Sequence, residues 1–270
     1  MNFKYIHLYA DYTTKNLDLH RVAEGVSKTF SNCTIDIRPP FLQYTRNSIS
    51  SNCIAEELAS IHISDTKQPY PHQPKRRDKQ EDINSVLFEK NLISNPHRTS
   101  CLYDGFMMQS LYSRLLPVKE ETIDNIHIIF DSRLTCTFSE EDYRYHARAI
   151  ICGTPTIIST TGIVEGPAKP KDFYFRQIAR ISRAGDTEEL KKQFTGRFID
   201  YDDDRINSIA VGYTIQALFF FLTDGDPFCN DTNCKIFNAH WQEDLIRTQV
   251  NNQRMCQTHL LFLDRFLNRY

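Results

Sequence analysis

The sequence lacks the features of several large classes of protein. Its 270 residues carry a net charge of only −2, so no overall positive charge favours nucleic acid as a partner. The longest apolar run, Ala217–Leu222, is too short to cross a bilayer, and the residues after Met1 lack the apolar core of a signal peptide. We therefore expect a soluble, cytoplasmic protein that does not engage a membrane.

Glycine is scarce, and the cysteines do not indicate a disulfide framework. The chain has 9 glycines against 18 phenylalanines and 13 tyrosines, which indicates an ordered, aromatic-rich protein. Its hydrophobic content of 40% can form a substantial core. Scattered cysteines among apolar residues are expected to be small buried side chains in a reducing compartment; they are Cys33, Cys53, Cys101, Cys136 and Cys152.

Four candidate metal ligands lie in two close pairs near the end of the chain. Cys229 and Cys234 form a C-x4-C pair, and after 21 further residues Cys256 and His259 form a C-x2-H pair. Thiolate and imidazole ligands suit tetrahedral Zn²⁺ better than hard cations such as Mg²⁺. A site with four protein ligands is closed, so we expect one Zn²⁺ with a structural role. The alternative is one or two buried cysteines and a surface histidine without an ion.

The pattern of apolar residues predicts an α/β (α+β) fold. The opening strand, helix and strand, at residues 3–10, 18–30 and 34–38, form a βαβ unit with a parallel strand pair. Further strands are expected at 125–130, 133–138, 146–153 and 155–160. Further helices are expected at 52–63, 83–93, 104–116, 173–181, 187–194, 203–222, 238–250 and 260–266.

We expect a single domain over residues 1–270, built of four parts. These are the opening βαβ part at 1–63, a Pro-rich basic loop at 64–82, a core of sheet and helices at 83–200, and the long helix with the Cys/His segment at 201–270. The loop contains the cluster Lys75-Arg76-Arg77. This cluster could contact phosphate, but a solvated surface loop is the favoured interpretation.

A second set of polar residues provides candidates for catalysis. His240 and Glu243 lie three apart on the predicted helix 238–250, and His146 and Arg148 lie two apart on a predicted strand, so each pair could share one face. Glu165 lies in the Gly- and Pro-containing segment 162–170, which we interpret as a loop. A reactive site would require these side chains to converge in one cleft.

Each of these candidates also has a structural interpretation. His240 beside Trp241 could be a packing residue, and Glu165 could form an ion pair with Lys169 or Arg148. The acidic run at 202–204 could bind a cation, but it could equally cap the long helix and complement its dipole.

Several long and unusual segments resemble an archaeal family of metallopeptidase-like proteins over nearly the full chain. They are Tyr145–Arg148, Ile157–Pro170, Arg197–Asp203 and Asn238–Glu243. The order of the elements is more distantly similar to archaemetzincins. Those peptidases hold a second zinc through C-x4-C and a later C-x2-C, so Cys229, Cys234 and Cys256 would match its first three cysteines and His259 would replace the fourth. The resemblance implies a metzincin-like mixed sheet with flanking helices and a helical C-terminal part that is stabilised by bound zinc.

The sequence departs from that family pattern at its catalytic motif. HExxH, which supplies two zinc-binding histidines and a glutamate that activates water, is absent from the whole chain. Residues 210–222 of the corresponding helix contain no histidine, glutamate or aspartate. Apolar side chains cannot hold a catalytic metal, so the peptidase chemistry of archaemetzincins is not expected here.

Two functions are therefore weighed against each other. The first is a metallopeptidase-like zinc hydrolase with a rebuilt site formed by the polar candidates above. The second is a catalytically inactive, zinc-stabilised module that binds a peptide or a protein, in which Phe219–Phe221 fill the former site. Nucleic-acid binding through the basic cluster is the weakest of the interpretations.

Overall fold

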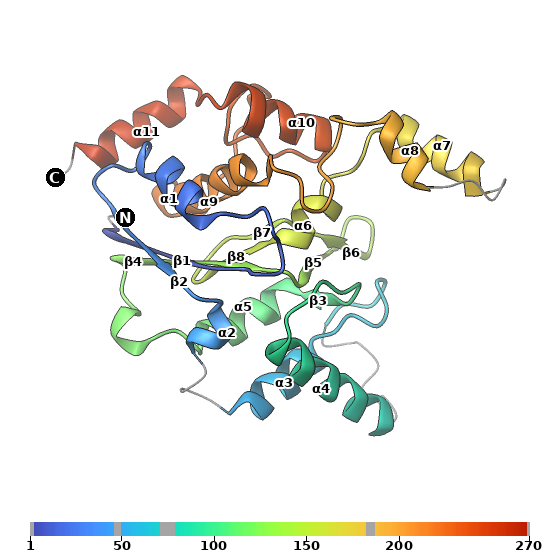
Figure 1. The fold of residues 1–270 in the computed structure, drawn as a ribbon. Coiled ribbons are helices and arrows are strands. Elements are labelled where there is room, and N and C mark those ends of the chain that lie inside the picture. Colours follow the sequence, from blue (N-terminus) through green and yellow to red (C-terminus); the bar gives the residue numbers. More distant parts are fainter. Residues whose placement is uncertain (1–2, 46–49, 71–78, 182–186, 269–270) are drawn as a thin grey trace.

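The computed structural model describes residues 3–45, 50–70, 79–181 and 187–268 (Figure 1). The basic cluster predicted at 75–77 lies outside these residues. The last part of the predicted loop 64–82 is helical, because a helix begins at Lys79. None of the described helices combines the length and the apolar character needed to cross a bilayer.

A five-stranded mixed sheet lies at the centre of the fold. Its strands, in spatial order, are β2 (Thr34–Arg38), β1 (Tyr5–Tyr9), β4 (Asn125–Asp131), β8 (Thr156–Ser159) and β7 (Ile150–Ile151). The first four strands run parallel to one another, and β7 is an antiparallel edge strand. The predicted α/β class and the opening parallel βαβ unit are confirmed.

Helices cover both faces of this sheet (Figure 1). One face carries α1 (Leu19–Ser27), α9 (Ile206–Leu222), α10 (Gln242–Ile246) and α11 (Gln257–Leu267). The other carries α2 (Phe41–Tyr44), α3 (Ser51–Ser60), α4 (Lys79–Ser94) and α5 (Gly105–Ser113). Side chains alternate between the faces of a strand. Ile6 and Leu8 therefore enter the core beneath α1 and α9, and Tyr9 enters the core beneath α5.

A smaller second sheet shows that the predicted strand 146–153 is two strands. The sheet consists of β3 (Leu102–Asp104), β5 (Leu134–Ser139) and β6 (Arg144–Ala147), in that order. The Arg148 N–H still donates to the Thr135 carbonyl on β5, whereas the Ala149 carbonyl already accepts from Ser159 on β8. The chain thus passes from one sheet to the other between Arg148 and Ala149, and the prediction of one continuous strand is wrong.

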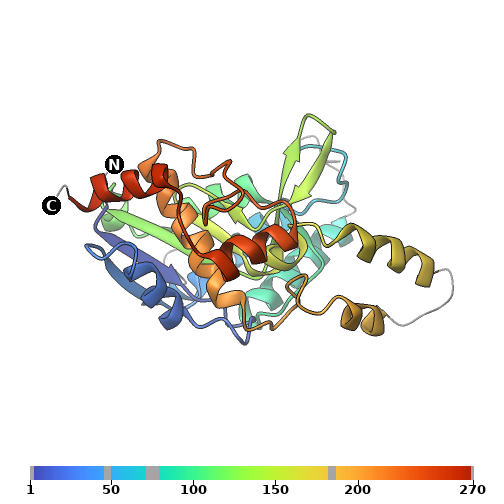
Figure 2. The same ribbon diagram turned by 90° about the horizontal axis from the view of Figure 1, so that it is seen from above.

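The segment predicted as a loop at 162–170 begins inside a short helix. Helix α6 (Thr160–Glu165) is capped by the Ser159 side chain, which accepts a hydrogen bond from the Gly162 N–H. Two further helices, α7 (Lys171–Ile181) and α8 (Thr187–Gln193), extend away from the central sheet (Figure 2). They pack through a small aromatic cluster that includes Phe173 and Phe194.

The long helix begins later than predicted. It starts at Ile206, and no acidic residue lies in its first turn. Asp203 instead accepts a hydrogen bond from the Arg205 backbone and forms an ion pair with the Arg205 guanidinium. The acidic run therefore precedes the helix and does not cap it.

Gly162 allows α6 to lie directly against Arg148, where the chain passes from one sheet to the other. A Cβ atom on Gly162 would come within 2.2 Å of the Arg148 carbonyl oxygen, which also accepts a hydrogen bond from the Thr135 hydroxyl. We expect Gly162→Ala to lower the free energy of unfolding by about 2 kcal/mol, because backbone must shift to relieve the collision. Chemical denaturation measures this change.

Gly25→Ala is the matched control for this prediction. Gly25 also lies in a helix, but its added Cβ would meet the side-chain methyl groups of Val211, which can move more easily than backbone. Alanine also improves intrinsic helix propensity equally at both positions, by about 1 kcal/mol. An unchanged denaturation midpoint for Gly162→Ala would show that α6 does not need this close approach.

Candidate metal centre and adjoining pocket

The two ligand pairs of the C-terminal segment lie together. The Sγ atoms of Cys229 and Cys256 are 3.7 Å apart, and His259 Nδ1 is 3.0 Å from Cys256 Sγ and 3.8 Å from Cys234 Sγ. All four ligand atoms lie within 4.8 Å of one another. A tetrahedral ion with metal–sulfur bonds of about 2.3 Å separates two sulfurs by about 3.8 Å. The donor set and its spacing therefore fit a metal ion.

Local backbone structure positions the ligands of this Cys3His group. Cys229 and Cys234 lie on one loop, Cys256 is the residue before α11, and His259 lies in its first turn. The Asp231 N–H donates to Cys229 Sγ and the Cys256 N–H donates to Cys234 Sγ, each over 3.3 Å. Such N–H···S bonds favour the thiolate form and orient the sulfurs toward an ion.

Burial sets the protonation states of Cys229 and His259 before an ion binds. Burial raises the pKa of the Cys229 thiol to about 12, so this thiol is protonated at pH 7 when no ion is bound. Burial also lowers the pKa of His259, so the imidazole is neutral and keeps a lone pair for a metal. A metal must therefore displace thiol protons, and its affinity falls as the pH falls.

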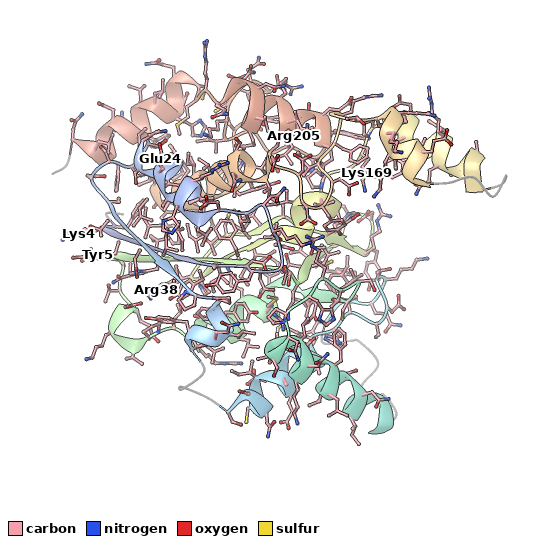
Figure 3. All side chains as sticks on the ribbon, in the orientation of Figure 1. Lys4, Tyr5, Glu24, Arg38, Lys169 and Arg205 are labelled. Carbon is pink, nitrogen blue, oxygen red and sulfur yellow. The ribbon has the colours of Figure 1, made fainter. Side chains whose placement is uncertain are left out.

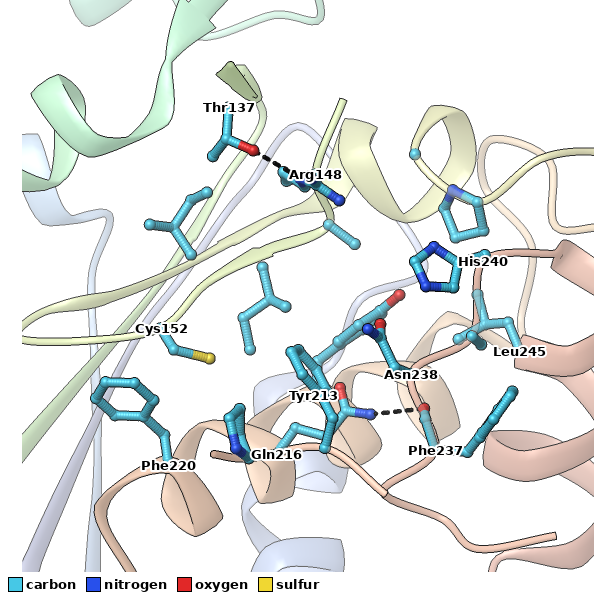
Figure 4. Close-up of a pocket in the computed structure, with 18 of the residues that line it drawn as sticks. Thr137, Arg148, Cys152, Tyr213, Gln216, Phe220, Phe237, Asn238, His240 and Leu245 are labelled. Carbon is cyan, nitrogen blue, oxygen red and sulfur yellow. Dashed lines mark hydrogen bonds between the residues drawn. The ribbon is translucent and has the colours of Figure 1, made fainter. Parts of the chain in front are cut away.

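A pocket of about 470 Å³ lies between the edge strand β7 and helix α9 (Figure 4). Its walls are mainly apolar and include Ile150, Tyr213 and Phe220. Its polar side chains include two of the catalytic candidates, Arg148 and His240. Among the described residues that line the pocket, none carries a carboxylate.

Arg148 is the principal charged group of this pocket. Its Nε atom donates to the Thr137 hydroxyl over 2.7 Å (Figure 4). Within the described residues, no ion pair involves Arg148. The remaining guanidinium N–H groups can therefore bind an anionic group of a ligand.

His146 and Glu165 lie outside the pocket lining and have structural partners. His146 Nε2 is 2.8 Å from an Asp142 carboxylate oxygen. Glu165 accepts a hydrogen bond from the Tyr201 hydroxyl and forms an ion pair with Lys169. The structural interpretation of Glu165 as a partner of Lys169 thus holds, and Glu165 ends a helix where a loop was predicted.

His240 and Glu243 do not share a helix face, contrary to the prediction. Residues 238–241 precede α10, because the Ala168 N–H donates to the His240 carbonyl and the Gln242 N–H donates back to the Ala168 carbonyl. Glu243 lies on α10 and pairs with Arg197, and only His240 lines the pocket. Of the five catalytic candidates, the pocket brings together Arg148 and His240.

The segment predicted as one helix at 238–250 is also shorter and less regular than expected. Helix α10 passes directly into a π-helical segment, η2 (Arg247–Asn252). The helix ladder starts only at Gln242, because the preceding backbone pairs with Ala168. The periodicity of the sequence carries no information about this long-range pairing.

Two polar clusters of the described residues were not predicted from the sequence. The first contains His7, Glu120 and His127, whose ligand atoms lie within 4.8 Å of one another. Burial, followed by the charge of His7, lowers the pKa of His127 to about 4, so its imidazole is neutral at pH 7. The alternation of polar and apolar residues along β1 was a signal of a polar face, but it did not identify the partners.

The second cluster surrounds a fully buried carboxylate, Glu89. Glu89 accepts hydrogen bonds from the Tyr103 hydroxyl over 2.6 Å and from Arg133 over 3.1 Å, and it lies 2.7 Å from His62 Nε2. Arg133 also pairs with Asp131. These groups come from α4, from β3 and the residues before it, and from β4 and the connection that follows it, so no short motif could reveal them.

Comparison with known proteins identifies the family. Residues 2–266 match a family described as "Probable metallopeptidase family (DUF6775)", so the chain belongs to this family. The resemblance expected from the sequence is therefore confirmed. No curated protein sequence matches the chain.

Among solved structures, the chain is similar to the crystal structure of archaemetzincin from Methanopyrus kandleri. The two are 11% identical and superpose with a TM-score of 0.45, over 99% of this chain and 97% of that chain.

Metallopeptidase chemistry requires a catalytic metal in a cleft, held by side chains that can bind it. The part of α9 that faces the pocket contributes Tyr213, Gln216 and Phe220, none of which can replace the ligands of HExxH. His240 is the one described pocket residue with an imidazole. The pocket residues therefore do not fit a catalytic metal, whereas the Cys3His group does fit a metal ion.

Proposed function

We propose that this member of the metallopeptidase family binds extended peptides in the pocket beside β7 and does not cleave them. The observation that carries this proposal is the pocket itself, which combines an apolar wall and one arginine without an ion-pair partner in the described chain. A hydrolytic site would need a group that activates water, and a metal site would need converging ligands. The described pocket residues provide neither a carboxylate nor a ligand set.

The edge strand supports a backbone-mediated mode of binding. The Ser159 N–H donates to the Ala149 carbonyl, so these two residues form a hydrogen-bonded antiparallel pair. The next residue, Ile150, then directs its N–H and carbonyl away from β8, on the free edge of the sheet. Ile150 also lines the pocket. A peptide can add to this edge as a further strand, with its side chains in the apolar pocket.

Arg148 determines the direction in which a peptide lies along the edge strand. A guanidinium group binds a carboxylate through two parallel hydrogen bonds. Arg148 lies two residues before the edge strand β7. We therefore infer that the ligand carries a carboxylate, from a C-terminus or an acidic side chain, near this end of β7.

The ion that we assign to the Cys3His group is Zn²⁺, with a structural role. Three thiolates and an imidazole favour Zn²⁺ over hard cations, and four protein ligands leave no position for a substrate. The eight cysteines of the chain are all free of disulfides. Free thiols and a thiolate metal site both suit a reducing compartment, which supports a cytoplasmic location.

Arg148→Met should weaken peptide binding at least about tenfold, because a charged hydrogen bond contributes about 1.5–3 kcal/mol. A peptide library with free and amidated C-termini would first identify ligands. Binding can then be titrated by the fluorescence of Trp241, the single tryptophan, which follows the pocket residue His240. The variant retains the aliphatic stem, so it removes mainly the charge.

Arg144→Met is the control for this experiment, since Arg144 is an exposed arginine on β6 that pairs with Asp142. It should bind peptides as the wild type does. Equal loss in both variants would contradict the assigned role of Arg148. The same mixtures should be examined by mass spectrometry, where chelator-sensitive cleavage of a peptide would overturn the proposal and support the hydrolase interpretation.

A further inference from the structure

A second concentration of potential metal ligands lies on the central sheet, away from the pocket and from the Cys3His group. His7 on β1 and His127 on β4 are direct partners in the parallel register, so their side chains leave the sheet on the same face. Their ring centroids are 4.9 Å apart. Glu120, from the short helix η1 (Val118–Glu120), lies over them, with its carboxylate Oε2 3.8 Å from His127 Nε2.

His127 has a hydrogen-bond partner at one ring nitrogen, whereas His7 has partners at both. His7 Nδ1 lies 3.2 Å from an Asp36 carboxylate oxygen, and His127 Nδ1 lies 3.0 Å from the Tyr9 hydroxyl. Histidines that bind metals commonly use one nitrogen for such an orienting partner and the other for the ion. The two Nε2 atoms are then the ligand positions, and an ion at His7 Nε2 would replace the 2.8 Å contact that this nitrogen makes with Asn125 Oδ1.

His127 Nε2 is the observation that most directly indicates a ligand. His127 is 1% exposed, and its Nε2 atom has no hydrogen-bond partner among the described residues. A buried nitrogen without a partner costs about 1–3 kcal/mol. An ion between this atom and the Glu120 carboxylate would remove that cost.

We propose that His7, His127 and Glu120 form a second metal site, which binds Zn²⁺. The Asn125 side-chain oxygen, released from its hydrogen bond with His7 Nε2 when an ion binds there, is the candidate for a fourth donor. Two imidazoles with carboxylate and amide oxygens favour a transition metal over Mg²⁺ or Ca²⁺. The Glu120 side chain is 24% exposed, so an ion can reach the group from solvent.

The charged side chains around the site allow a divalent cation to bind. Arg38 (labelled in Figure 3) donates to both Glu120 carboxylate oxygens, over 2.7 and 2.9 Å, and to Asp36 over 2.6 Å. The two carboxylates outnumber the one guanidinium, so these three groups together carry a net negative charge. Each Glu120 oxygen has a further lone pair beyond the one that Arg38 uses. Arg38 therefore orients the carboxylate, and a divalent cation leaves the group with a small positive charge.

Metal counting on the full chain tests this proposal. Purified apoprotein would be reconstituted with Zn²⁺ at pH 7 and examined by native mass spectrometry. We expect about two ions per chain in the wild type and about one in His127→Gln, since loss of a ligand removes the second ion. Cys234→Ser should likewise retain about one ion, because it disrupts the other site. His97→Gln, at an exposed histidine outside both groups, should keep both ions.

Cobalt identifies which site each ion occupies. Co²⁺ bound by the cysteines produces a thiolate charge-transfer absorption, which a site of imidazole and oxygen ligands cannot produce. His127→Gln should therefore keep this band while it loses one ion, and Cys234→Ser should lose the band. Glu120→Gln is a second variant, at a half-buried position, and decides the question if His127→Gln does not fold. One ion in the wild type, or a second ion that persists in the folded variants, would overturn the proposal.

Discussion

Cys234→Ser should remove the ion of the Cys3His group and destabilise the chain by about 4 kcal/mol when free Zn²⁺ is 1,000-fold above its dissociation constant. Cys234 is 1% exposed and shares the group with Cys229, Cys256 and His259. An ion that binds only the folded chain stabilises it, because the unfolded chain does not bring these residues together. Zinc content and the free energy of unfolding should be measured on the same samples.

Cys136→Ser separates the role of the ion from the role of a buried thiol. Cys136 is 2% exposed on β5 and belongs to no group of potential metal ligands among the described residues. Its replacement should keep the zinc and cost only the burial of a hydroxyl, about 1–2 kcal/mol. If both variants lost equal stability and kept equal zinc, the Cys3His group would be ordinary packing and the metal assignment would fail.

Glu89→Gln should lower the free energy of unfolding by about 3 kcal/mol, which is the second largest effect that we expect. Glu89 is fully buried and receives hydrogen bonds from Tyr103 and Arg133. Removal of its charge leaves the buried Arg133 guanidinium with Asp131 as its remaining carboxylate partner. Breaking a buried ion pair from one side typically costs about 3–5 kcal/mol, and the remaining partner reduces this cost.

The same carboxylate predicts a pH dependence. Burial alone would raise the pKa of Glu89, but the hydrogen bond to His62 and the charge of Arg133 outweigh it and lower the pKa below its ordinary value. The unfolded chain therefore binds more protons than the folded chain as the pH falls below about 5. The stabilisation is complete above that pH and is lost as the pH falls toward the depressed pKa.

Denaturation of the wild type and Glu89→Gln between pH 7 and pH 4 measures this contribution. The stability difference between the two proteins should shrink as the pH falls, since the wild type alone loses the Glu89 charge. Glu57→Gln serves as the control, because Glu57 is half exposed and pairs with Arg114 on the surface. A difference that stays constant over this range would show that Glu89 does not titrate as inferred.

The C-terminal ligand group was predictable because its information is local. C-x4-C and C-x2-H each place two ligands within one turn or loop, so only one long-range step was needed to bring the pairs together. The opening βαβ unit was predictable for the same reason, since its strand, helix and strand follow one another directly. Family membership also followed from long continuous segments, and the match over residues 2–266 confirmed it.

The catalytic candidates depended on contacts between distant segments, where local patterns carry little information. The periodicity around His240 and Glu243 indicated a helix, but the backbone before Gln242 pairs with Ala168 instead. Glu165 was expected in a loop because glycines and prolines surround it, yet Ser159 caps a helix that ends at Glu165. The first case was decided by a long-range backbone contact, whereas the second was decided by a local helix cap that the surrounding glycines and prolines obscured.

The sequence by itself determined most of the strands and helices, the family and the four ligands of the Cys3His group, but it missed β3 and joined β6 to β7. The tertiary structure alone decided that Arg148 and His240 share a pocket, and that His7 meets His127, 120 residues later in the chain, on the neighbouring strand. The physical reason is that a helix turn or a short ligand spacing depends on neighbouring residues. The register of parallel strands depends instead on how the whole core packs, and no local pattern contains it.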